Sequence, residues 1–394
     1  FSTADGIRLK VLKIKKKHLH DRTSDSAKKV LDLVTEYIEH FRRTLHFTYQ
    51  LNYDCLKDEL RPLARVKAKI TRLFNITDFI DNVLFKCALG DLMTRLGNRY
   101  MLTNACCGVN PASSQWAVLY RRFEGQNVLS KDVSGMDETL RPFITYVICE
   151  FVSQFYPEGS FDSVFARWAV ESCMLAIRFN DGVGTINGQG NSSGNQGTTF
   201  INTCSMQVLE NLSSFILVHQ FDYSWDRFIM ERRLAIYSDD TLCSHPSEWY
   251  NMFNVWYAYK TLFGITVTKA DKSAITRDEP PHSIEEVDFL SRGFMKDKDT
   301  NIVYAPLGLD SLLSQLYFVR VPKTQIGTPY LIEQLNINIG NVSRELIELP
   351  VTLASTLARD INAFIKDHKL NEQGVKLVYY RPEQRTAIKA SYYA

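Results

Sequence analysis

The sequence predicts an α+β fold, because short segments with strand patterns alternate with longer segments of helical spacing. Strand patterns occur at residues 127–133 and 287–295, and residues 233–243 read as a hairpin with apolar arms around a polar tip. Apolar stretches at residues 142–155 and 198–218 are long enough for buried helices. Strands and helices are therefore both expected within one chain.

Four further segments show a local sequence pattern. Residues 10–20 are basic, and a solvated loop and an RNA contact explain them equally well. Apolar residues recur at helical spacing in residues 26–45, whereas basic and apolar residues alternate in residues 55–74. Residues 186–197 form a Gly/Ser/Asn loop.

The C-terminal part of the chain is predicted to be helical. Residues 247–263 form a helix that stops at Gly264, a common C-terminal signal. From about residue 296 the chain changes character, with helical patterns at residues 309–316 and 346–366. We therefore predict a lobe boundary near that position.

Composition sets limits without identifying a function. The 394 residues carry 46 basic and 44 acidic side chains, so a nucleic-acid channel would require local segregation of charge. The eight cysteines show no metal-ligand spacing and are typical of reduced thiols in a cytosolic protein. No signal peptide or transmembrane run is present, and a start at Phe1 suggests a proteolytic product or a fragment.

Two acidic motifs lie where strands end. Asp132 is followed by Asp137, and Asp239 and Asp240 are adjacent at the tip of the predicted hairpin. Such carboxylates repel one another unless a cation neutralises them, and a pair of hard divalent cations would suit phosphoryl transfer. Asp-Asp pairs are also common in turns, so neither motif alone is decisive.

The motifs gain weight from their order along the chain. The series is residues 57–61 (KDELR) with basic residues up to Arg72, Asp132 with Asp137, residues 193–202 (SGNQGTTFIN), residues 237–240 (YSDD), residues 270–273 (ADKS) and residues 289–292 (FLSR). This order resembles motifs F, A, B, C, D and E of picorna-like viral RNA-dependent RNA polymerases. The resemblance covers about three-fifths of the chain, from Lys57 to Phe294.

The resemblance implies roles for the acidic residues. Asp132 and Asp239 would be the main ligands of two Mg²⁺ ions, with weaker help from Asp240. Asp137, Thr198 and Asn202 would recognise the ribose 2′-hydroxyl of the incoming nucleotide, because a polar site rejects a sugar that leaves its groups unpaired. Hydrogen bonding at a helix start is the alternative explanation for Thr198 and Asn202.

The resemblance also implies nucleotide- and RNA-binding residues. A flexible loop around Ser193, Gly194 and Gly197 would let the backbone approach template and nucleotide. The channel for the nucleoside triphosphate would be lined by basic side chains, namely Lys57, Arg61, Arg65 and Arg72. Arg72 would grip the triphosphate, although a solvated basic face is the usual reading of such a run.

Two further residues receive roles from the same resemblance. Lys272 corresponds to the general acid that protonates departing pyrophosphate, although a lone lysine is otherwise a surface residue. Arg292 would contact primer phosphates, although a buried Phe-Leu strand is an equally natural reading of its neighbourhood.

The sequence departs from the family pattern at several positions. Ser238 replaces the usual glycine before the aspartates, and we expect it to relax the metal preference toward Mn²⁺. Activity with Mn²⁺ that never exceeds activity with Mg²⁺ would contradict this expectation. Ile70 and Ser291 stand where basic residues are common, which weakens the phosphate and primer contacts inferred nearby.

The implied architecture is a right-hand polymerase with fingers, a palm and a helical thumb. The expected division is 1–121 fingers (N-terminally incomplete), 122–150 palm with motif A, 151–185 fingers insertion, 186–294 palm with motifs B to E, and 295–394 thumb. The implied activity is template-directed RNA synthesis from nucleoside triphosphates during viral genome replication. Partners would be RNA template and primer, a small viral protein primer and other replication proteins, in membrane-associated complexes of the host cytoplasm.

Two other functions are weighed against this one. A reverse transcriptase also carries Tyr-x-Asp-Asp, but that class generally places an aromatic residue where Asp137 stands, to exclude the 2′-hydroxyl. A catalytically inactive RNA-binding replication protein would not need Asp132, Asp239 and Lys272 intact. A comparison of ribo- and deoxynucleotide incorporation would distinguish a reverse transcriptase from an RNA polymerase.

Overall fold

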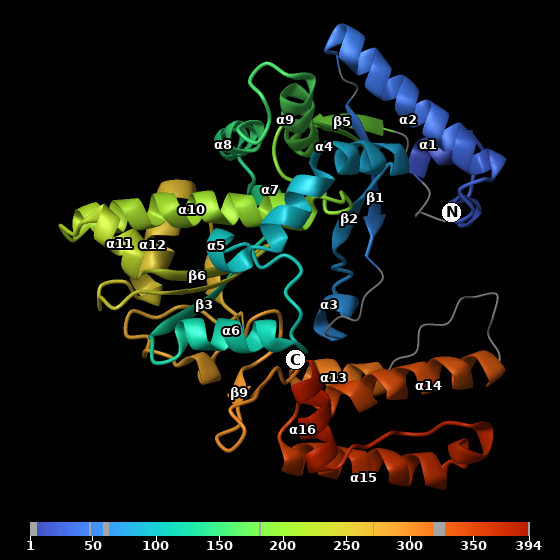
Figure 1. Ribbon diagram of the computed structural model, residues 1–394, viewed down its shortest axis with the longest axis vertical. Coiled ribbons are helices and arrows are strands. Elements are labelled where there is room, and N and C mark those ends of the chain that lie inside the picture. The colour runs from blue at the N-terminus through green and yellow to red at the C-terminus, as the bar shows by residue number, and fades with distance from the viewer. Residues whose placement is uncertain are drawn as a thin grey trace.

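A computed structural model describes residues 6–46, 49–57, 63–180, 183–270, 272–317 and 328–392. Two four-stranded sheets and a helical C-terminal region organise these residues (Figure 1). The mixed helix-and-sheet architecture predicted from the sequence is confirmed. We call the sheet with strands at residues 128–133, 233–237, 240–244 and 267–269 the palm sheet, and the sheet with strands at residues 50–56, 73–77, 176–180 and 183–187 the fingers sheet.

The palm sheet has the strand order β6-β7-β3-β8. Its strands are β3 (Val128–Val133), β6 (Arg233–Tyr237), β7 (Asp240–Ser244) and β8 (Val267–Lys269). All neighbours are antiparallel, and the β6–β7 hairpin pairs Tyr237 with Asp240. The strand at residues 127–133 and the hairpin at residues 233–243 are therefore confirmed.

Helices cover both faces of the palm sheet. One face packs on α10 (Thr198–Gln220) and α12 (Met252–Phe263), which share a hydrophobic core with Leu129, Val133 and Leu234. The other face packs on α6 (Ser114–Phe123), whose core includes Val128, Ala235 and Leu242. Alternate strand residues point to opposite faces, so each face of these strands contributes buried apolar side chains to one of the two cores.

The fingers sheet joins two segments that are far apart in the chain. Its order is β2-β1-β4-β5, with β1 (Gln50–Leu56), β2 (Leu73–Thr77), β4 (Ala176–Asn180) and β5 (Val183–Asn187). Strands β1 and β4 are parallel, with Gln50 paired to Ala176. The N-terminal segment and the predicted insertion therefore share one sheet.

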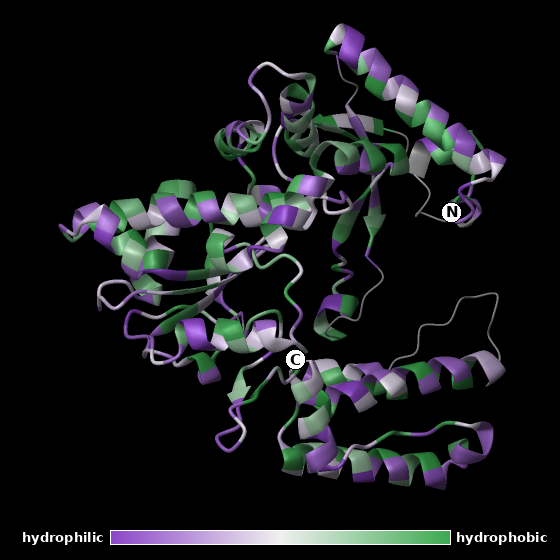
Figure 2. Cartoon of the chain, viewed as in Figure 1, coloured by the Kyte–Doolittle hydropathy of each residue, from purple (hydrophilic) through white to green (hydrophobic). Residues whose placement is uncertain are grey.

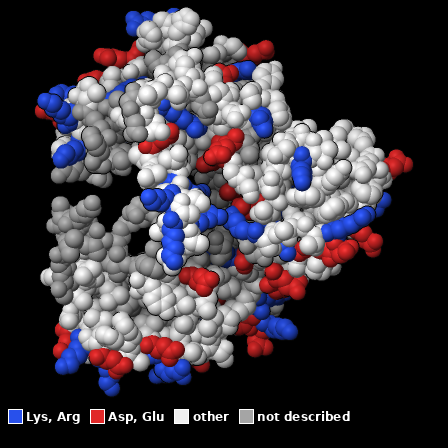
Figure 3. Space-filling view, turned by 180° about the vertical axis from the view of Figure 1, so that it is seen from behind, with Lys and Arg blue, Asp and Glu red and all other residues white. Residues whose placement is uncertain are grey.

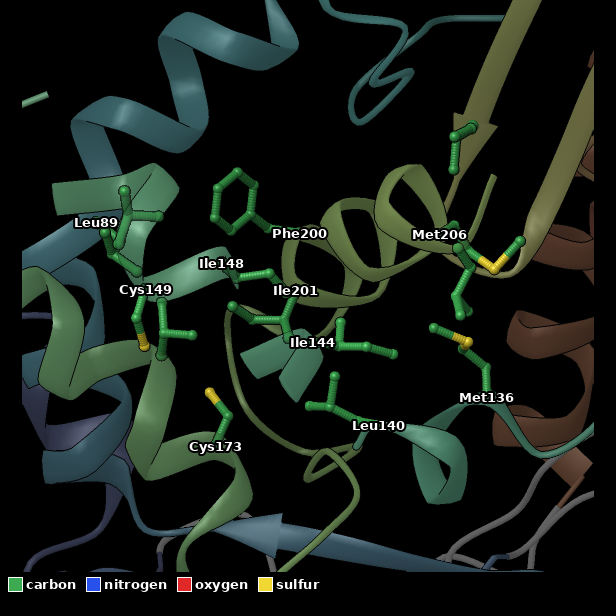
Figure 4. Close-up of a cluster of buried hydrophobic side chains, with 14 of the residues drawn as sticks. Leu89, Met136, Leu140, Ile144, Ile148, Cys149, Cys173, Phe200, Ile201 and Met206 are labelled. Atoms are coloured by element: carbon green, nitrogen blue, oxygen red, sulfur yellow. The ribbon is translucent and has the colours of Figure 1, made fainter. Parts of the chain in front are cut away.

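Helices around the fingers sheet merge with those of the palm. They are α1 (Gly6–Val11), α2 (Asp25–Thr44), α4 (Phe79–Gly97), α8 (Pro142–Ser153) and α9 (Phe161–Met174). Figure 4 shows side chains of α8, α9 and the first half of α10 converging in one apolar cluster. This continuous core fixes the start of α10 against the fingers.

The C-terminal region is a separate helical cluster. It contains α13 (Leu309–Tyr317), α14 (Thr328–Glu345), α15 (Val351–Asp367) and α16 (Pro382–Ser391). Hydrophilic and hydrophobic residues alternate along α15 (Figure 2), and its buried residues Ala354, Ala358 and Ile361 face the cluster. The predicted helix at 309–316 is confirmed, whereas α14 and α16 were not predicted.

Shorter elements connect these layers. They are η2 (Lys16–Leu19), α3 (Leu63–Lys67), α5 (Tyr100–Thr103), α7 (Met136–Thr139), α11 (Trp225–Glu231), η3 (Ile284–Glu286), β9 (Met295–Lys296), β10 (Val303–Tyr304) and η5 (Leu370–Gln373). Figure 1 shows α3 projecting from the fingers sheet toward the C-terminal helices.

Several predicted boundaries need correction. The strand expected at residues 287–295 is wrong: Phe289 and Arg292 form an isolated bridge around Leu290 and Ser291, whose φ angles of 56° and 60° are left-handed. Backbone of this hand turns the chain instead of extending it. The helix expected from residue 247 begins at Met252, after its cap Asn251, and the one expected from residue 346 begins after Pro350.

Candidate active site

The predicted acidic residues meet at one end of the palm sheet. Strands β3 and β7 pair Lys131 with Thr241, so Asp132 and Asp240 follow that pair at the same end of the two strands. Asp239 lies in the hairpin tip between Tyr237 and Asp240. Antiparallel pairing thus converts a long separation in sequence into proximity in space.

The carboxylates also influence one another electrostatically. Burial, followed by repulsion from Asp132 and Asp137, raises the pKa of Asp239 above its usual value. Burial, followed by repulsion from Asp239 and Asp132, raises the pKa of Asp240 to about 6. A cation relieves both effects, and the charge of the Lys272 ammonium already acts to lower both pKa values.

Lys272 forms an ion pair with Asp132. Its Nζ contacts Asp132 Oδ2, while about 70% of its side chain stays exposed and the Asp132 side chain is about 8% exposed. The lysine follows β8, which pairs Asp132 with Thr268, and it has a left-handed φ of 66°. The predicted general acid therefore lies at the carboxylate cluster and carries the counter-charge there.

The donor chemistry fits hard divalent cations, since carboxylate oxygens are the ligands that Mg²⁺ prefers. Among the described residues, no group of three His, Cys, Asp or Glu side chains is arranged so that it could hold a metal ion. Asp132 is turned toward Lys272, so its carboxylate would have to be shared or released for a metal to bind.

Asp137 and Asn202 are joined by a direct hydrogen bond. Asn202 Nδ2 donates to Asp137 Oδ1 at 2.8 Å and to Ser238 Oγ at 3.2 Å. Asn202 Oδ1 accepts from Asn191 Nδ2 at 2.8 Å, and the Asn191 backbone N–H donates to the Asp137 carbonyl at 2.6 Å. Two of the three side chains predicted to recognise ribose, Asp137 and Asn202, are therefore held together beside the carboxylate cluster.

Thr198 differs from these two residues. Its hydroxyl donates to the Ser192 carbonyl at 2.6 Å and to the Asn195 carbonyl at 2.8 Å, in the loop before α10. This is the helix-start hydrogen bonding that the sequence offered as an alternative. A direct ribose contact by Thr198 stays a prediction.

The loop that precedes α10 packs against the fingers. The Ser193 hydroxyl accepts from the Asn75 backbone N–H at 3.0 Å, and a Cβ at Gly194 would collide with the Asn75 carbonyl. A Cβ at Gly197 would fall within the Phe85 ring. Both glycines therefore permit close packing on β2 and α4 in this conformation, and their approach to template or nucleotide stays a prediction.

The predicted basic residues lie on the projection from the fingers sheet. The Lys57 backbone N–H donates to the Arg72 carbonyl at 2.8 Å, which places the two residues side by side, and both side chains are exposed. Arg65 lies on α3 and is also exposed. Figure 3 shows Lys and Arg side chains gathered on this projection. Arg61 lies outside the described residues.

Arg292 is engaged by the C-terminal helices. Its two terminal nitrogens each donate to Glu345 of α14 at 2.8 Å, and Nη1 also donates to the Ala305 carbonyl at 2.9 Å. The planar guanidinium thus binds both oxygens of one carboxylate through two hydrogen bonds. The structure places this side chain at the junction with α14, and its contact with primer phosphates stays a prediction.

Comparison with known proteins assigns the family. The model of the family described as viral RNA-dependent RNA polymerase matches residues 2–352. The chain belongs to this family. It is therefore an RNA-directed RNA polymerase by class, as the order of its motifs predicted.

The relatives are viral polyproteins, and the chain matches one segment of each. It is 28% identical over 311 residues to the genome polyprotein of Rice tungro spherical virus (strain Vt6), covering 75% of the chain and 9% of that polyprotein. It is 25% identical over 305 residues to the replicase polyprotein of Acute bee paralysis virus, covering 74% of the chain and 16% of that polyprotein. The polymerase thus spans a small part of these relatives.

A solved structure supports the fold. The Sicinivirus 3Dpol RNA dependent RNA polymerase is similar with a TM-score of 0.71 at 20% identity, covering 91% of this polymerase and 70% of that chain. The right-hand architecture implied by the motifs is therefore confirmed at the level of the fold. In the described part of the polymerase, no helix combines the length and apolar character needed to cross a membrane.

Sequence reasoning missed three residues that build the site. Asn191 received no role from the sequence, yet it is 1% exposed and donates a hydrogen bond to the Asn202 side chain. Thr203 is buried and accepts from the Ser238 backbone N–H at 2.9 Å. Lys131, next to Asp132, is buried in an ion pair with Glu210 of α10. Only their positions beside motif residues could have signalled these roles.

Proposed function

We propose that this polymerase extends an RNA strand on an RNA template by transferring nucleotides from nucleoside triphosphates to the RNA 3′ end. The observation that carries the proposal is the convergence of Asp132, Asp239 and Asp240 at one end of the palm sheet. These carboxylates would hold two Mg²⁺ ions, which lower the pKa of the attacking hydroxyl and stabilise the leaving oxygen. Mn²⁺ would be accepted as a substitute.

The protein groups around the carboxylates suit the remaining tasks. Lys272 donates to Asp132 at the carboxylate cluster, and its ammonium would supply the proton to the departing pyrophosphate. The bonded pair Asp137 and Asn202 offers an acceptor and a donor to a 2′-hydroxyl. The exposed Arg65 and Arg72 would attract the triphosphate electrostatically.

Ribonucleotides are favoured over deoxyribonucleotides as substrates. Asp137 is half-buried and hydrogen-bonded to Asn202, so a sugar without a 2′-hydroxyl would leave polar groups unpaired. The match to viral RNA polymerases supports the same choice. Template and primer RNA are the proposed partners, together with a small viral protein primer and other replication proteins.

The relatives are parts of viral replicase and genome polyproteins, which supports a role in genome replication. We propose that this role is performed in membrane-associated complexes of the host cytoplasm. Proximity labelling of the polymerase in infected cells would test the location, and labelling confined to nuclear proteins would contradict it.

Replacement of Asp239 tests the function directly. We expect Asp239→Asn to abolish primer extension on an RNA template, by about a thousandfold or more, because loss of a ligand charge removes several kcal/mol of transition-state stabilisation. Single-nucleotide incorporation should be measured with and without Mg²⁺, together with circular dichroism to verify the fold.

The matched control is Asp226→Asn on the exposed start of α11, which removes the same charge away from the palm sheet. It should retain wild-type incorporation. Extension by Asp239→Asn at the wild-type rate would refute the proposed mechanism.

A further inference from the structure

The hairpin tip of the palm sheet carries a serine in a conformation that favours glycine. Ser238 has a φ of 56°, in the left-handed region that L side chains rarely adopt. A glycine would occupy the same backbone conformation without steric cost. A side chain at this position is therefore expected to make a compensating interaction.

The Ser238 hydroxyl makes that interaction with Asn202. Its Oγ accepts from Asn202 Nδ2 at 3.2 Å, and the same nitrogen donates to Asp137 Oδ1 at 2.8 Å. An amide nitrogen carries two hydrogens, so one can serve each acceptor. The Asp137 carboxylate accepts hydrogen bonds, which identifies Nδ2 as the end of the Asn202 amide that faces it, and Asn191 donates to the other end, Asn202 Oδ1, at 2.8 Å.

The backbone of Ser238 is held by the same helix. Its N–H donates at 2.9 Å to Thr203 Oγ1, and that hydroxyl donates to the Thr199 carbonyl of α10 at 2.7 Å. Asn202 and Thr203 are consecutive residues of α10, so one turn of this helix contacts both the backbone and the side chain of Ser238. The tip that carries Asp239 is thereby tied to the amide that pairs with Asp137.

We propose that Ser238 is a positioning residue for ribose selection, which holds the Asn202 amide toward Asp137 so that the pair is preset for a 2′-hydroxyl. This inference rests on the proposed function and names a determinant of its specificity. A glycine at this position would leave the second Asn202 hydrogen without the Ser238 acceptor. The amide would then be freer to rotate, and the site would lose part of its preorganisation.

Glycine and alanine substitutions separate this role from a structural one. Ser238→Gly removes the hydroxyl and also relieves the left-handed backbone, so the fold should be as stable as the wild type or more stable. Ser238→Ala removes the hydroxyl but keeps the unfavourable Cβ. If both variants change sugar selection in the same way, the cause is therefore the loss of the hydroxyl and not a change in stability.

The experiment measures kcat/KM for a nucleoside triphosphate and for its 2′-deoxy analogue on the same primed RNA, together with the melting temperature. We expect both variants to lower the ribo-to-deoxy ratio about two- to tenfold, which is the effect of one neutral hydrogen bond. The loss should come from the ribonucleotide, with kcat/KM for the deoxynucleotide nearly unchanged.

Two controls make the result specific. Thr241→Val removes a hydroxyl three residues away that makes no hydrogen bond among the described residues, and it should leave the ratio unchanged. In an Asn202→Ala background, Ser238→Gly should produce no further loss, because its partner is already absent.

Three outcomes would overturn the inference. The ratio could be unchanged in both Ser238 variants, or it could fall further when Ser238→Gly is added to Asn202→Ala. In either case, incorporation of nucleotides by the wild-type protein would leave the proposed function intact. A wild-type protein that incorporates no ribonucleotide would instead refute the proposed function, and the inference would fall with it.

Discussion

Lys131 and Asp132 are adjacent in β3, yet their side chains have different surroundings. Lys131 is 1% exposed and pairs with Glu210, which also accepts from the Tyr259 hydroxyl, so it lies among α10 and α12. Asp132 lies with Asp239, Asp240 and Lys272. Strand alternation sends consecutive residues to opposite faces, which places Lys131 in a buried ion pair with Glu210 and Asp132 in the carboxylate cluster beside Lys272.

Lys272 provides a prediction at the same scale. Lys272→Met should lower the rate of nucleotide incorporation about a hundredfold or more, because it removes the proposed general acid. The same change should strengthen Mn²⁺ binding, because Asp132 would no longer be paired with an ammonium. Rapid-quench incorporation gives the rate, and electron paramagnetic resonance of free Mn²⁺ gives the affinity.

These two effects have opposite directions, which excludes simple unfolding as their common cause. Lys260→Met, on the last turn of α12, is a matched loss of a lysine away from the carboxylates. An unchanged incorporation rate in Lys272→Met would contradict the general-acid role, and weaker Mn²⁺ binding would contradict the competition for Asp132.

At the scale of elements, the loop between β5 and α10 depends on contacts with the fingers. Asn82 of α4 accepts from the Gln196 backbone N–H at 2.8 Å, and Asn195 Nδ2 donates to Gln50 Oε1 at 3.1 Å. Ser192 accepts from Asn52 of β1. The loop that leads into α10 is therefore shaped by β1 and α4 from the N-terminal part of the chain.

Gly197 tests this packing. Gly197→Ala should destabilise the protein by about 1–3 kcal/mol or more, because the added methyl group would occupy the space of the Phe85 ring. Gly188→Ala is the control, since a Cβ there meets nothing within 4 Å. Urea unfolding of both variants measures the difference.

A smaller side chain in place of the Phe85 ring should restore part of the lost stability. Adding Phe85→Leu to Gly197→Ala should recover stability relative to the single variant, because the clash is removed. Equal stability of Gly197→Ala and Gly188→Ala would show that the loop does not pack against α4 as described.

At the scale of the whole molecule, a few long-range contacts hold the palm to the C-terminal helices. Arg292 binds Glu345 of α14, and Lys389 of α16 is buried in an ion pair with Glu348 at 2.7 Å. Glu348 also accepts from the Ala305 backbone N–H at 2.9 Å. These contacts join the C-terminal helices to segments that pack on the palm sheet.

The Arg292–Glu345 pair gives a prediction about that junction. Arg292→Gln and Glu345→Gln should each lower stability by about 1–2 kcal/mol, because either change breaks a bidentate, partly buried ion pair. Thermal unfolding measures this loss, and fluorescence anisotropy with primed RNA measures binding.

The RNA measurement decides the role of Arg292. A structural role predicts the same loss of RNA affinity in both variants. A primer contact predicts a loss in Arg292→Gln only, since Glu345→Gln would release the guanidinium toward phosphate. Wild-type stability in both variants would contradict the proposed junction.

The sequence alone determined the motif residues, the β6–β7 hairpin, β3 and the helices α2, α8, α10 and α13 within a few residues. Their signals are local: periodicity, a polar tip between apolar arms, and residue types that suit phosphate chemistry. The order of the motifs also determined the family, which the family model confirmed.

The partners of these residues depend on how distant elements pack together. The β1–β4 pairing, the Lys131–Glu210 pair and the Asn191–Asn202–Ser238 network join residues that are separated in the chain. The turn at Leu290 and the engagement of Arg292 by Glu345 likewise depend on neighbours from other elements. Hydrogen bonds and ion pairs of this kind have no periodic trace in sequence, because each depends on how whole elements pack.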